Sequence, residues 1–304
     1  MSPGAGYGHA GGRRTVTGAM GDPGYFGPDS ITWEVNRELT VLFGGARALL
    51  MHAAHPLIAA GARQTSMYSR DPWARLIRTL MLQSTVTFGS KAEAEEAADK
   101  INKLHTKVNG IDPVTGERYD ALDHDQLLWV HAALEVSSIY FFERTVRRLT
   151  PAERQRYHEE SLVAAELILL PRTHVPATYE ETEAYVDRMA HSETMMLTDV
   201  AADVAEIIRS GPVPRGVKWM WGFISFAAFG TLPDPLKDLY GVRWSRWRRV
   251  WLDANLRLLG AIRPYLPRRF RLIGPAQIAA KRLAGESDIR IIDSMRSASR
   301  PSAR

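Results

Sequence analysis

The residues of this sequence best able to do chemistry are histidines set among apolar neighbours. They are His105 in "INKLHTKVNG" (101–110), His131 in "LLWVHAAL" (127–134), and His52 with His55 in "LLMHAAHPLIAAG" (49–61). A buried imidazole left without a partner costs on the order of 1–3 kcal/mol, so each needs a hydrogen bond or a metal. The alternatives are therefore a structural histidine with a local partner and a ligand for a metal or for haem iron.

His52 and His55 are three residues apart, which makes them neighbours on one face of a helix. Two such imidazoles could bind a metal together, with carboxylates completing a non-haem site. Pro56 has no N–H, so it frees the His52 carbonyl from its helical partner. The other interpretation is that both rings pack and form hydrogen bonds locally.

Arg75 and Thr79 in "DPWARLIRTLML" (71–82) are four residues apart and stack on one side of a predicted helix. This helix is apolar on most sides, which predicts burial, and a buried guanidinium needs an anionic or strongly polar partner. That partner is a propionate, a carboxylate or dioxygen, or else a glutamate in a structural ion pair. Arg78 lies one step away, where its side chain could reach the surface.

Composition and motifs exclude several classes of enzyme. The chain has no cysteine, which excludes disulfides, zinc–thiolate sites, iron–sulfur clusters and thiolate-ligated haem. It also lacks a GxGxxG after a strand, a Walker A loop, an HExxH and a GxSxG. These absences argue against nucleotide-binding enzymes, zinc proteases and α/β hydrolases.

The elements that must position these residues all read as helices. Helix starts are predicted at Asp71, Ser90, Asp123, Thr150 and Thr178, each a side chain that can cap free N–H groups. No convincing alternating strands are found, and "IDPVTGERYDAL" (111–122) reads as a turn-rich loop. The sequence predicts an all-α protein of eight to eleven helices. Its parts are a flexible segment 1–28, one large helical domain 29–285 and a basic flexible tail 286–304.

Charge and hydropathy along the chain bear on its cellular location and on the partners that it could bind. The net charge is +5, with much of the excess in "RWSRWRRVW" (243–251), "RPYLPRRFRL" (263–272) and the last residues. No nucleic-acid motif accompanies it, so no nucleic-acid partner is expected. The Gly-rich N-terminus has no apolar stretch, and the longest apolar run, 219–232, is too short to span a bilayer. We expect a cytoplasmic protein whose basic, tryptophan-rich C-terminal third could touch a membrane from outside.

Several blocks in order resemble the catalytic-domain family shared by the ER-bound oxygenase MpaB and the latex-clearing rubber oxygenases, in its bacterial branch. They are "RALLMHAAHPLIAAGARQTSMYSRDPWARLIRTLMLQSTVTFG", "INKLHTKVNG", "GERYDALDHDQLLWVHAALEVSSIYFFER" and "LTPAERQRYHEE", within roughly residues 30 to 250. The resemblance implies a single large multi-helix domain with a globin-like core. It also implies b-type haem and oxidative cleavage of carbon–carbon double bonds in isoprenoid chains.

The resemblance further implies roles for particular residues. Arg75 and Thr79 match a pair that lines the haem pocket, and His105, followed by Val108, matches the proximal iron ligand. His131 is the alternative ligand. The rubber oxygenases also use a glutamate and a distal lysine; this chain has Arg78 at the lysine-like position and no matching glutamate. Oxygen chemistry is therefore expected more firmly than polyisoprene cleavage.

Together these observations predict a haem b oxygenase or oxidoreductase that uses dioxygen on a hydrophobic, isoprenoid or lipid-like small molecule. The alternatives are a haem- or ligand-binding sensor or carrier without turnover, and a non-haem metal protein.

Overall fold

A computed structural model describes residues 21–65, 80, 82–211, 216, 218–287, 289–291 and 293. Within these residues the protein is all-α apart from one small hairpin, as the sequence predicts. The first half contains α1 (Ile31–Asn36), α2 (Leu42–Ala54), α3 (Pro56–Gln64), α6 (Lys91–His105), β1 (Asn109–Ile111), β2 (Arg118–Asp120) and α7 (His124–Thr145). The second half contains α8 (Pro151–Leu167), α9 (Tyr179–Ala190), α10 (Asp199–Ser210), α11 (Lys218–Gly230), α12 (Asp234–Leu239), α13 (Arg246–Ile262), α14 (Arg268–Arg271) and α15 (Gly274–Leu283).

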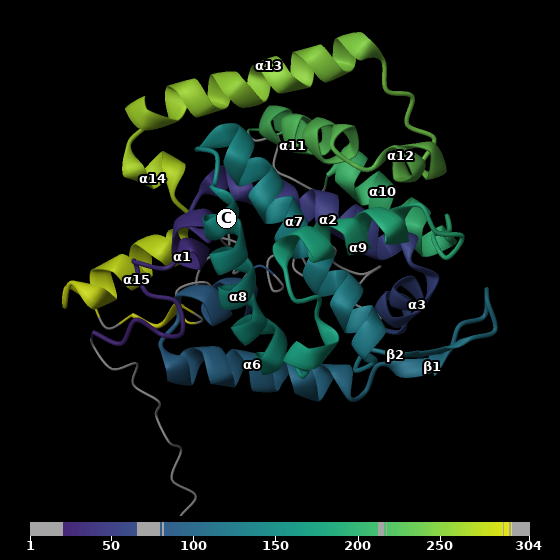
Figure 1. The fold of residues 1–304 in the computed structure, drawn as a ribbon, viewed down its shortest axis with the longest axis horizontal. Coiled ribbons are helices and arrows are strands. Elements are labelled where there is room, and N and C mark those ends of the chain that lie inside the picture. The colour runs from purple at the N-terminus through teal and green to yellow at the C-terminus, as the bar shows by residue number, and fades with distance from the viewer. Residues whose placement is uncertain are drawn as a thin grey trace, which may run out of the picture.

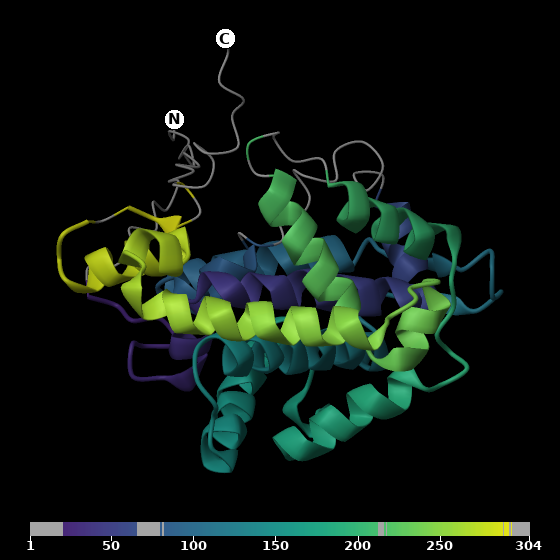
Figure 2. The same cartoon turned by 90° about the horizontal axis from the view of Figure 1, so that it is seen from above.

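The centre of the molecule is the packing of α2 on α7 (Figures 1 and 2). Most residues of α7 are buried, and its Trp129, Phe141 and Phe142 side chains are fully buried. The backbones come close because α2 carries a glycine there: a Cβ on Gly44 would lie 2.8 Å from the Ser137 carbonyl oxygen. Helices α1, α8, α9, α10 and α11 surround this pair, while α6 and α13 lie along opposite edges in Figure 1.

Helix starts agree closely with the capping signals in the sequence. Ser90, Thr150 and Thr178 each form a complete capping box with the glutamate three residues later. Asp123 caps α7 by accepting hydrogen bonds from the N–H groups of Asp125 and Gln126. The predicted start at Asp71 lies outside the described residues.

Three expectations about the elements were wrong. Apolar residues at helical spacing over 33–62 predict a helix with an interruption at Gly44-Gly45 and an end or kink near Pro56. The break near Pro56 is present, but the other division lies at 37–41, and α2 continues through both glycines. Asn109-Gly110 predicts the end of the helix that Ser90 caps, but the chain there folds into the antiparallel β1–β2 hairpin and α6 ends at His105. The described residues contain thirteen α-helices rather than eight to eleven, because α1, α12, α14 and α15 add short helices.

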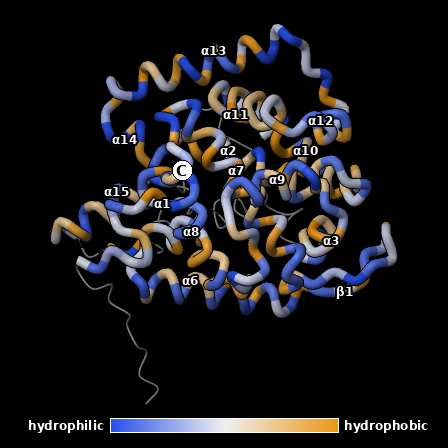
Figure 3. The backbone as a smooth tube through the Cα atoms, viewed as in Figure 1, coloured by the Kyte–Doolittle hydropathy of each residue, from blue (hydrophilic) through white to orange (hydrophobic). Residues whose placement is uncertain are grey.

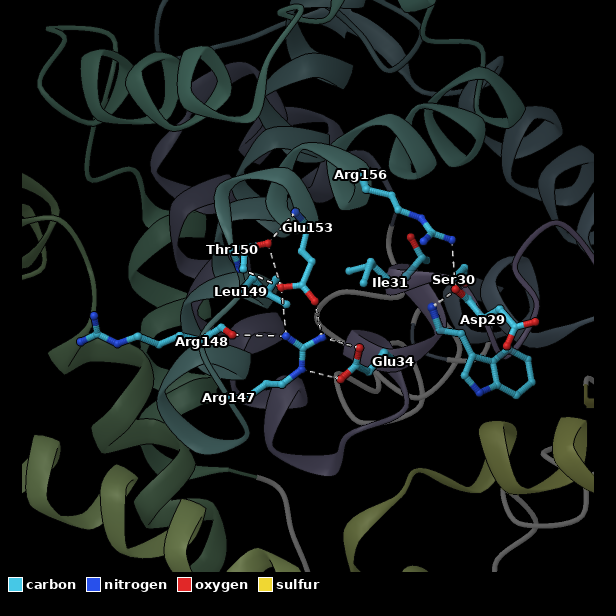
Figure 4. A network of polar contacts seen from close by, with 12 residues as sticks. Asp29, Ser30, Ile31, Glu34, Arg147, Arg148, Leu149, Thr150, Glu153 and Arg156 are labelled. Carbon is cyan, nitrogen blue, oxygen red and sulfur yellow. Dashed lines mark hydrogen bonds and ion pairs between the residues drawn. The ribbon is translucent and has the colours of Figure 1, made fainter.

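An ion-pair network attaches α1 to the centre (Figure 4). The Arg147 guanidinium, just after α7, donates to the Glu34 carboxylate at 2.7 and 2.8 Å and to the Glu153 carboxylate at 2.8 and 3.1 Å. Glu153 is also the residue that closes the capping box of α8. One guanidinium therefore connects α1, α7 and the start of α8.

The C-terminal helix α15 packs against the start of α6. Arg282 and Glu93 are both about 1% exposed and form an ion pair at 3.1 Å, while Arg282 also donates to the Phe88 carbonyl. The backbone N–H of Ile291 donates to the other Glu93 oxygen, and Ile291 is fully buried. Trp33 and Phe88 from the first half of the chain thus share one small core with residues of the C-terminal part, Ile273, Ala276, Ala279 and Ile291.

No single helix among the described residues is both long and apolar enough to cross a membrane. Residues 39–54 and 56–64 reach that length and composition only together, and they are bent by 100° at His55. Most of α2 is buried within the protein.

Candidate functional site

The predicted site residues divide into those the structure describes and those it does not. Arg75, Arg78 and Thr79 lie outside the described residues. His105 and His131, the two predicted iron ligands, are both described, as is the His52/His55 pair. The environments of these histidines differ sharply.

His105 is the last residue of α6 and is half-buried. Its Nδ1 atom is buried, and neither ring nitrogen forms a hydrogen bond with any residue the structure describes. Burial lowers the pKa of His105, which keeps the ring neutral at pH 7. A neutral imidazole with a free nitrogen is the form that binds a metal.

The end of α6 is held in place by α3 and the β1–β2 hairpin. Val108 and Tyr119 of the hairpin region pack on Ala60 of α3, and a Cβ on Gly61 would lie 3.1 Å from a Val108 methyl group. Gln64 donates to the Lys107 carbonyl at 3.3 Å and accepts from the Tyr119 hydroxyl at 3.2 Å. The backbone that carries His105 is therefore fixed from both sides.

His52 and His55 do not share a helix face, contrary to the sequence expectation. α2 ends at Ala54, and His55 adopts an extended conformation before Pro56 begins α3. The carbonyl of His52, which has no Pro56 N–H to bond, accepts from the N–H of His55 instead. The turn separates the two rings, which argues against a two-histidine metal site on one helix.

The two rings also differ in their partners. His52 Nε2 donates to the Val130 carbonyl at 3.1 Å, and burial lowers its pKa to about 4. His55 is buried with no hydrogen bond to its Nδ1 from a described residue, and burial lowers its pKa as well. His52 is thus structural, whereas His55 retains a free ring nitrogen.

His131 belongs to a buried polar cluster on α7 and α8. Its Nε2 atom lies 3.3 Å from the Ser161 hydroxyl and 3.6 Å from the Glu135 carboxylate. Burial lowers its pKa, although the nearby Glu135 carboxylate opposes that effect. This Nε2 is already engaged by protein groups, unlike the free nitrogen of His105.

The other imidazole of this cluster corrects the sequence analysis. Polar stretches around His124, His158, His174 and His191 predict surface positions for all four. His124, His174 and His191 are exposed, but His158 is fully buried. Its Nδ1 donates to Glu135 at 3.0 Å and its Nε2 donates to the Pro176 carbonyl at 3.0 Å. Burial opposes protonation, but the Glu135 carboxylate outweighs it and raises the pKa of His158.

Both ring nitrogens of His158 therefore face acceptors, which is the arrangement of an imidazolium paired with a carboxylate. The only sequence signal for this cluster is Glu135 one helical turn after His131 in an apolar helix. Buried carboxylates are rarely unpaired, but the partner comes from another helix. Sequence spacing alone cannot identify it.

A second buried charge was also missed. Arg47 of α2 is 5% exposed and donates to the Ser137 hydroxyl at 2.7 Å and to the Thr231 carbonyl at 2.9 Å. Its guanidinium carbon lies 5.1 Å from the centre of the Tyr140 ring, and burial lowers its pKa to about 10. It joins α2, α7 and the turn after α11 through polar groups.

Across the described residues, no three histidine, cysteine or acidic side chains are grouped so that they could hold a metal ion. A site built by one protein ligand, as haem requires, is compatible with this arrangement, and a non-haem site of three or more ligands from these residues is not. Among the described histidines, His105 and His55 each have a buried Nδ1 atom without a hydrogen-bond partner.

Comparison with known proteins agrees with this reading. No curated protein and no solved structure matches the chain. The family model described as "ER-bound oxygenase mpaB/B'/Rubber oxygenase, catalytic domain" matches residues 33–261. That range runs from α1 to the last turn of α13 and covers most of the chain. The chain therefore belongs to the family of mpaB and rubber oxygenase catalytic domains.

Proposed function

We propose that the protein is a haem b-dependent oxygenase that acts with dioxygen on a hydrophobic small molecule, and that His105 would hold the haem iron. Family membership supports oxygenase chemistry in general. The observation that carries the assignment of the ligand is the buried Nδ1 of a neutral His105, which has no hydrogen-bond partner among the described residues. His131 is the weaker choice, since its Nε2 faces Ser161 and Glu135.

When bound, haem supplies the activation of dioxygen, and this chain supplies ligation, orientation and an apolar environment. His105 would hold the iron from a backbone that α3 and the hairpin fix. Arg75 and Thr79, four residues apart in the sequence, would donate hydrogen bonds to a propionate or to the oxygen substrate. Arg78 would contribute a second positive charge next to the propionates.

The substrate class is inferred from the side chains next to the end of α6. Leu57 and Ala60 of α3 pack there with Val108 and Tyr119 in an apolar cluster. Apolar surface beside the iron ligand favours a hydrocarbon-like substrate over a strongly polar one. A haem-binding sensor or carrier would share the ligand but not consume oxygen with such substrates.

The test is an absorption spectrum of the full chain expressed with haem supply, compared with His105→Ala and His131→Ala. We expect a Soret band in the parent protein and in His131→Ala, and its loss or a shift in His105→Ala. External imidazole should restore the band in His105→Ala, because it fills the ligand position. A band that survives in His105→Ala but disappears in His131→Ala would move the ligand to α7.

Oxygenase activity is tested separately by oxygen uptake with apolar isoprenoid and fatty-acid substrates. Haem binding without oxygen consumption on any of them would favour the sensor or carrier. The absence of a Soret band in the parent protein would contradict the haem assignment itself.

A further inference from the structure

The surface formed by α11 and α13 is apolar yet open to solvent. A groove of about 880 Å³ runs between the two helices. Its walls include Trp219, Phe223, Phe226, Trp247, Trp251 and Leu258. Soluble proteins rarely expose a continuous apolar patch of this kind unless a partner or a membrane covers it.

The tryptophans of this α11–α13 surface are exposed rather than enclosed. Trp247 is 82% exposed, Trp219 79% and Trp251 52%. An enclosed ligand pocket would bury its aromatic rings, whereas these rings extend beyond the groove. The exposure therefore argues for a flat partner that lies over the surface and against a small molecule held inside.

Helical spacing aligns these residues along α13. Leu252 and Leu256 are buried against the protein, while Trp247, Trp251, Leu258 and Ile262 fall on an adjacent stripe. The stripe extends nearly the whole length of the helix, roughly 25 Å at 1.5 Å per residue. Figure 3 shows hydrophobic and hydrophilic positions alternating along α13, with α11 largely hydrophobic beside it.

Two further exposed aromatic residues follow α13 in the chain. Tyr265 is 86% exposed and Phe270 56%. Neither residue lines the groove, so a single peptide helix docked in it would leave both uncovered. Only a partner broader than the groove would reach these residues as well as the stripe.

The charge of this region is strongly positive. Residues 243–271 contain nine arginines and one acidic residue, Asp253. Arg263 is engaged by the Glu38 carboxylate at 2.8 Å, and Arg249 lies only 4.0 Å from Asp234. Arg243, Arg246 and Arg257 are exposed. The complementary partner is therefore anionic.

We propose that the α11–α13 surface docks the protein on the face of an anionic lipid bilayer. Tryptophan and tyrosine rings favour the membrane–water interface, since they are apolar with one polar atom. Arginines around them meet lipid phosphates bidentately and are attracted by the negative surface potential. Shallow insertion of an amphipathic helix needs this combination and needs no spanning segment. The proposal stands independently of haem binding.

The experiment is flotation of the full chain with vesicles of neutral phosphatidylcholine, and with vesicles in which about a third of the lipid is phosphatidylglycerol. We expect binding to the anionic vesicles that is at least about tenfold stronger than to the neutral ones. Added salt should weaken binding, because it screens the arginines. Equal binding to both compositions, or to neither, would overturn the proposal.

Two double variants separate the apolar and the charged contributions. Trp219→Ser with Trp247→Ser removes exposed rings, and Arg246→Ser with Arg257→Ser removes exposed charges. Each should reduce partition into anionic vesicles about tenfold or more. All four side chains are exposed, so the melting temperature should stay unchanged and a fall in binding reports the surface itself.

Matched controls lie on the opposite side of the molecule in Figure 1, at and near the hairpin and the end of α8. Ile111→Ser with Val114→Ser removes exposed apolar groups, and Arg118→Ser with Arg172→Ser removes the same amount of charge. Both should bind vesicles like the parent protein. Equal loss in a control and in its test variant would overturn the assignment of this surface.

Other occupants of the surface give different results. If a second copy of the chain covers it, sedimentation velocity shows a dimer that Trp219→Ser with Trp247→Ser dissociates, and the membrane proposal fails. If the surface is a general polyanion site, the arginine variant loses vesicle binding while the tryptophan variant keeps it. That result also contradicts docking by insertion.

Discussion

At the scale of single residues, the partner of a histidine ring determines the direction in which its pKa shifts. His52 and His158 are both imidazoles within the protein, but His52 faces one carbonyl and His158 faces a carboxylate and a carbonyl. Burial lowers the pKa of His52 to about 4, whereas Glu135 raises the pKa of His158. His105 lacks either kind of partner among the described residues, and for this reason it is the residue proposed to bind iron.

His52 gives the stability a defined pH dependence. Its folded pKa of about 4 lies below the usual 6.5, so the unfolded chain binds a proton first as the pH falls. Stability from this group is present above pH 6.5 and is lost between pH 6.5 and about 4. By pH 4.5 the loss should reach roughly 2–3 kcal/mol.

His52→Gln can still donate to the Val130 carbonyl but does not titrate. Its free energy of unfolding is measured in denaturant at pH 7 and at pH 4.5. Between these two pH values, we expect the fall for His52→Gln to be smaller than the fall for the parent protein by roughly 2–3 kcal/mol. His191→Gln, at an exposed position, is the control and should follow the parent. An identical pH dependence in all three proteins would contradict the burial of His52.

At the scale of elements, the close approach of α2 and α7 determines the centre of the fold. Gly44 and Gly45 are adjacent in the same helix, but only Gly44 faces α7. A Cβ at Gly44 would meet the Ser137 carbonyl at 2.8 Å, while a Cβ at Gly45 would meet nothing within 4 Å. Close packing of α2 on α7 therefore requires a glycine at position 44 but not at position 45.

Gly44→Ala should destabilise the protein by about 1–3 kcal/mol, because the backbone atom it meets cannot move without separating the helices. Gly45→Ala should stabilise it by about 0.5–1 kcal/mol, because alanine restricts the unfolded chain and favours helix. Thermal and denaturant unfolding of the two variants provide the comparison. Equal effects at the two positions would show that α2 and α7 are farther apart than described.

At the scale of the whole molecule, the C-terminal segment is part of the folded body. α15 meets α6 through the buried Arg282–Glu93 pair, and Glu93 also caps α6 and binds the Ile291 N–H. Removing the guanidinium leaves a carboxylate buried without its charged partner, which is costly. Stability and attachment of the C-terminal segment should therefore be lost together.

Arg282→Ala should lower the free energy of unfolding by about 3–5 kcal/mol and increase proteolytic cleavage around residues 274–291. Lys281→Ala, at the exposed neighbouring position, should change stability by less than about 0.5 kcal/mol. Denaturant unfolding and limited proteolysis measure the two effects. If Arg282→Ala behaved like Lys281→Ala, the pair would not hold the segment.

The sequence by itself determined the helical class, the starts of α6, α7, α8 and α9, and the family. Capping residues act on the backbone within three positions, and apolar periodicity is a local property, so Ser90, Thr150 and Thr178 could be read directly. Ordered blocks within roughly residues 30 to 250 carried the family resemblance, and the family model matches residues 33–261. The predicted roles of Arg75, Arg78 and Thr79 remain predictions.

Only the tertiary structure decided which partner each buried group has. The polar stretch around His158 predicts exposure, but Glu135 from another helix holds the ring inside the protein. The short hairpin after α6 has too few alternating residues to reveal a strand, yet it sets the end of that helix at His105. Burial and pairing depend on residues distant in the chain, and no local pattern records them.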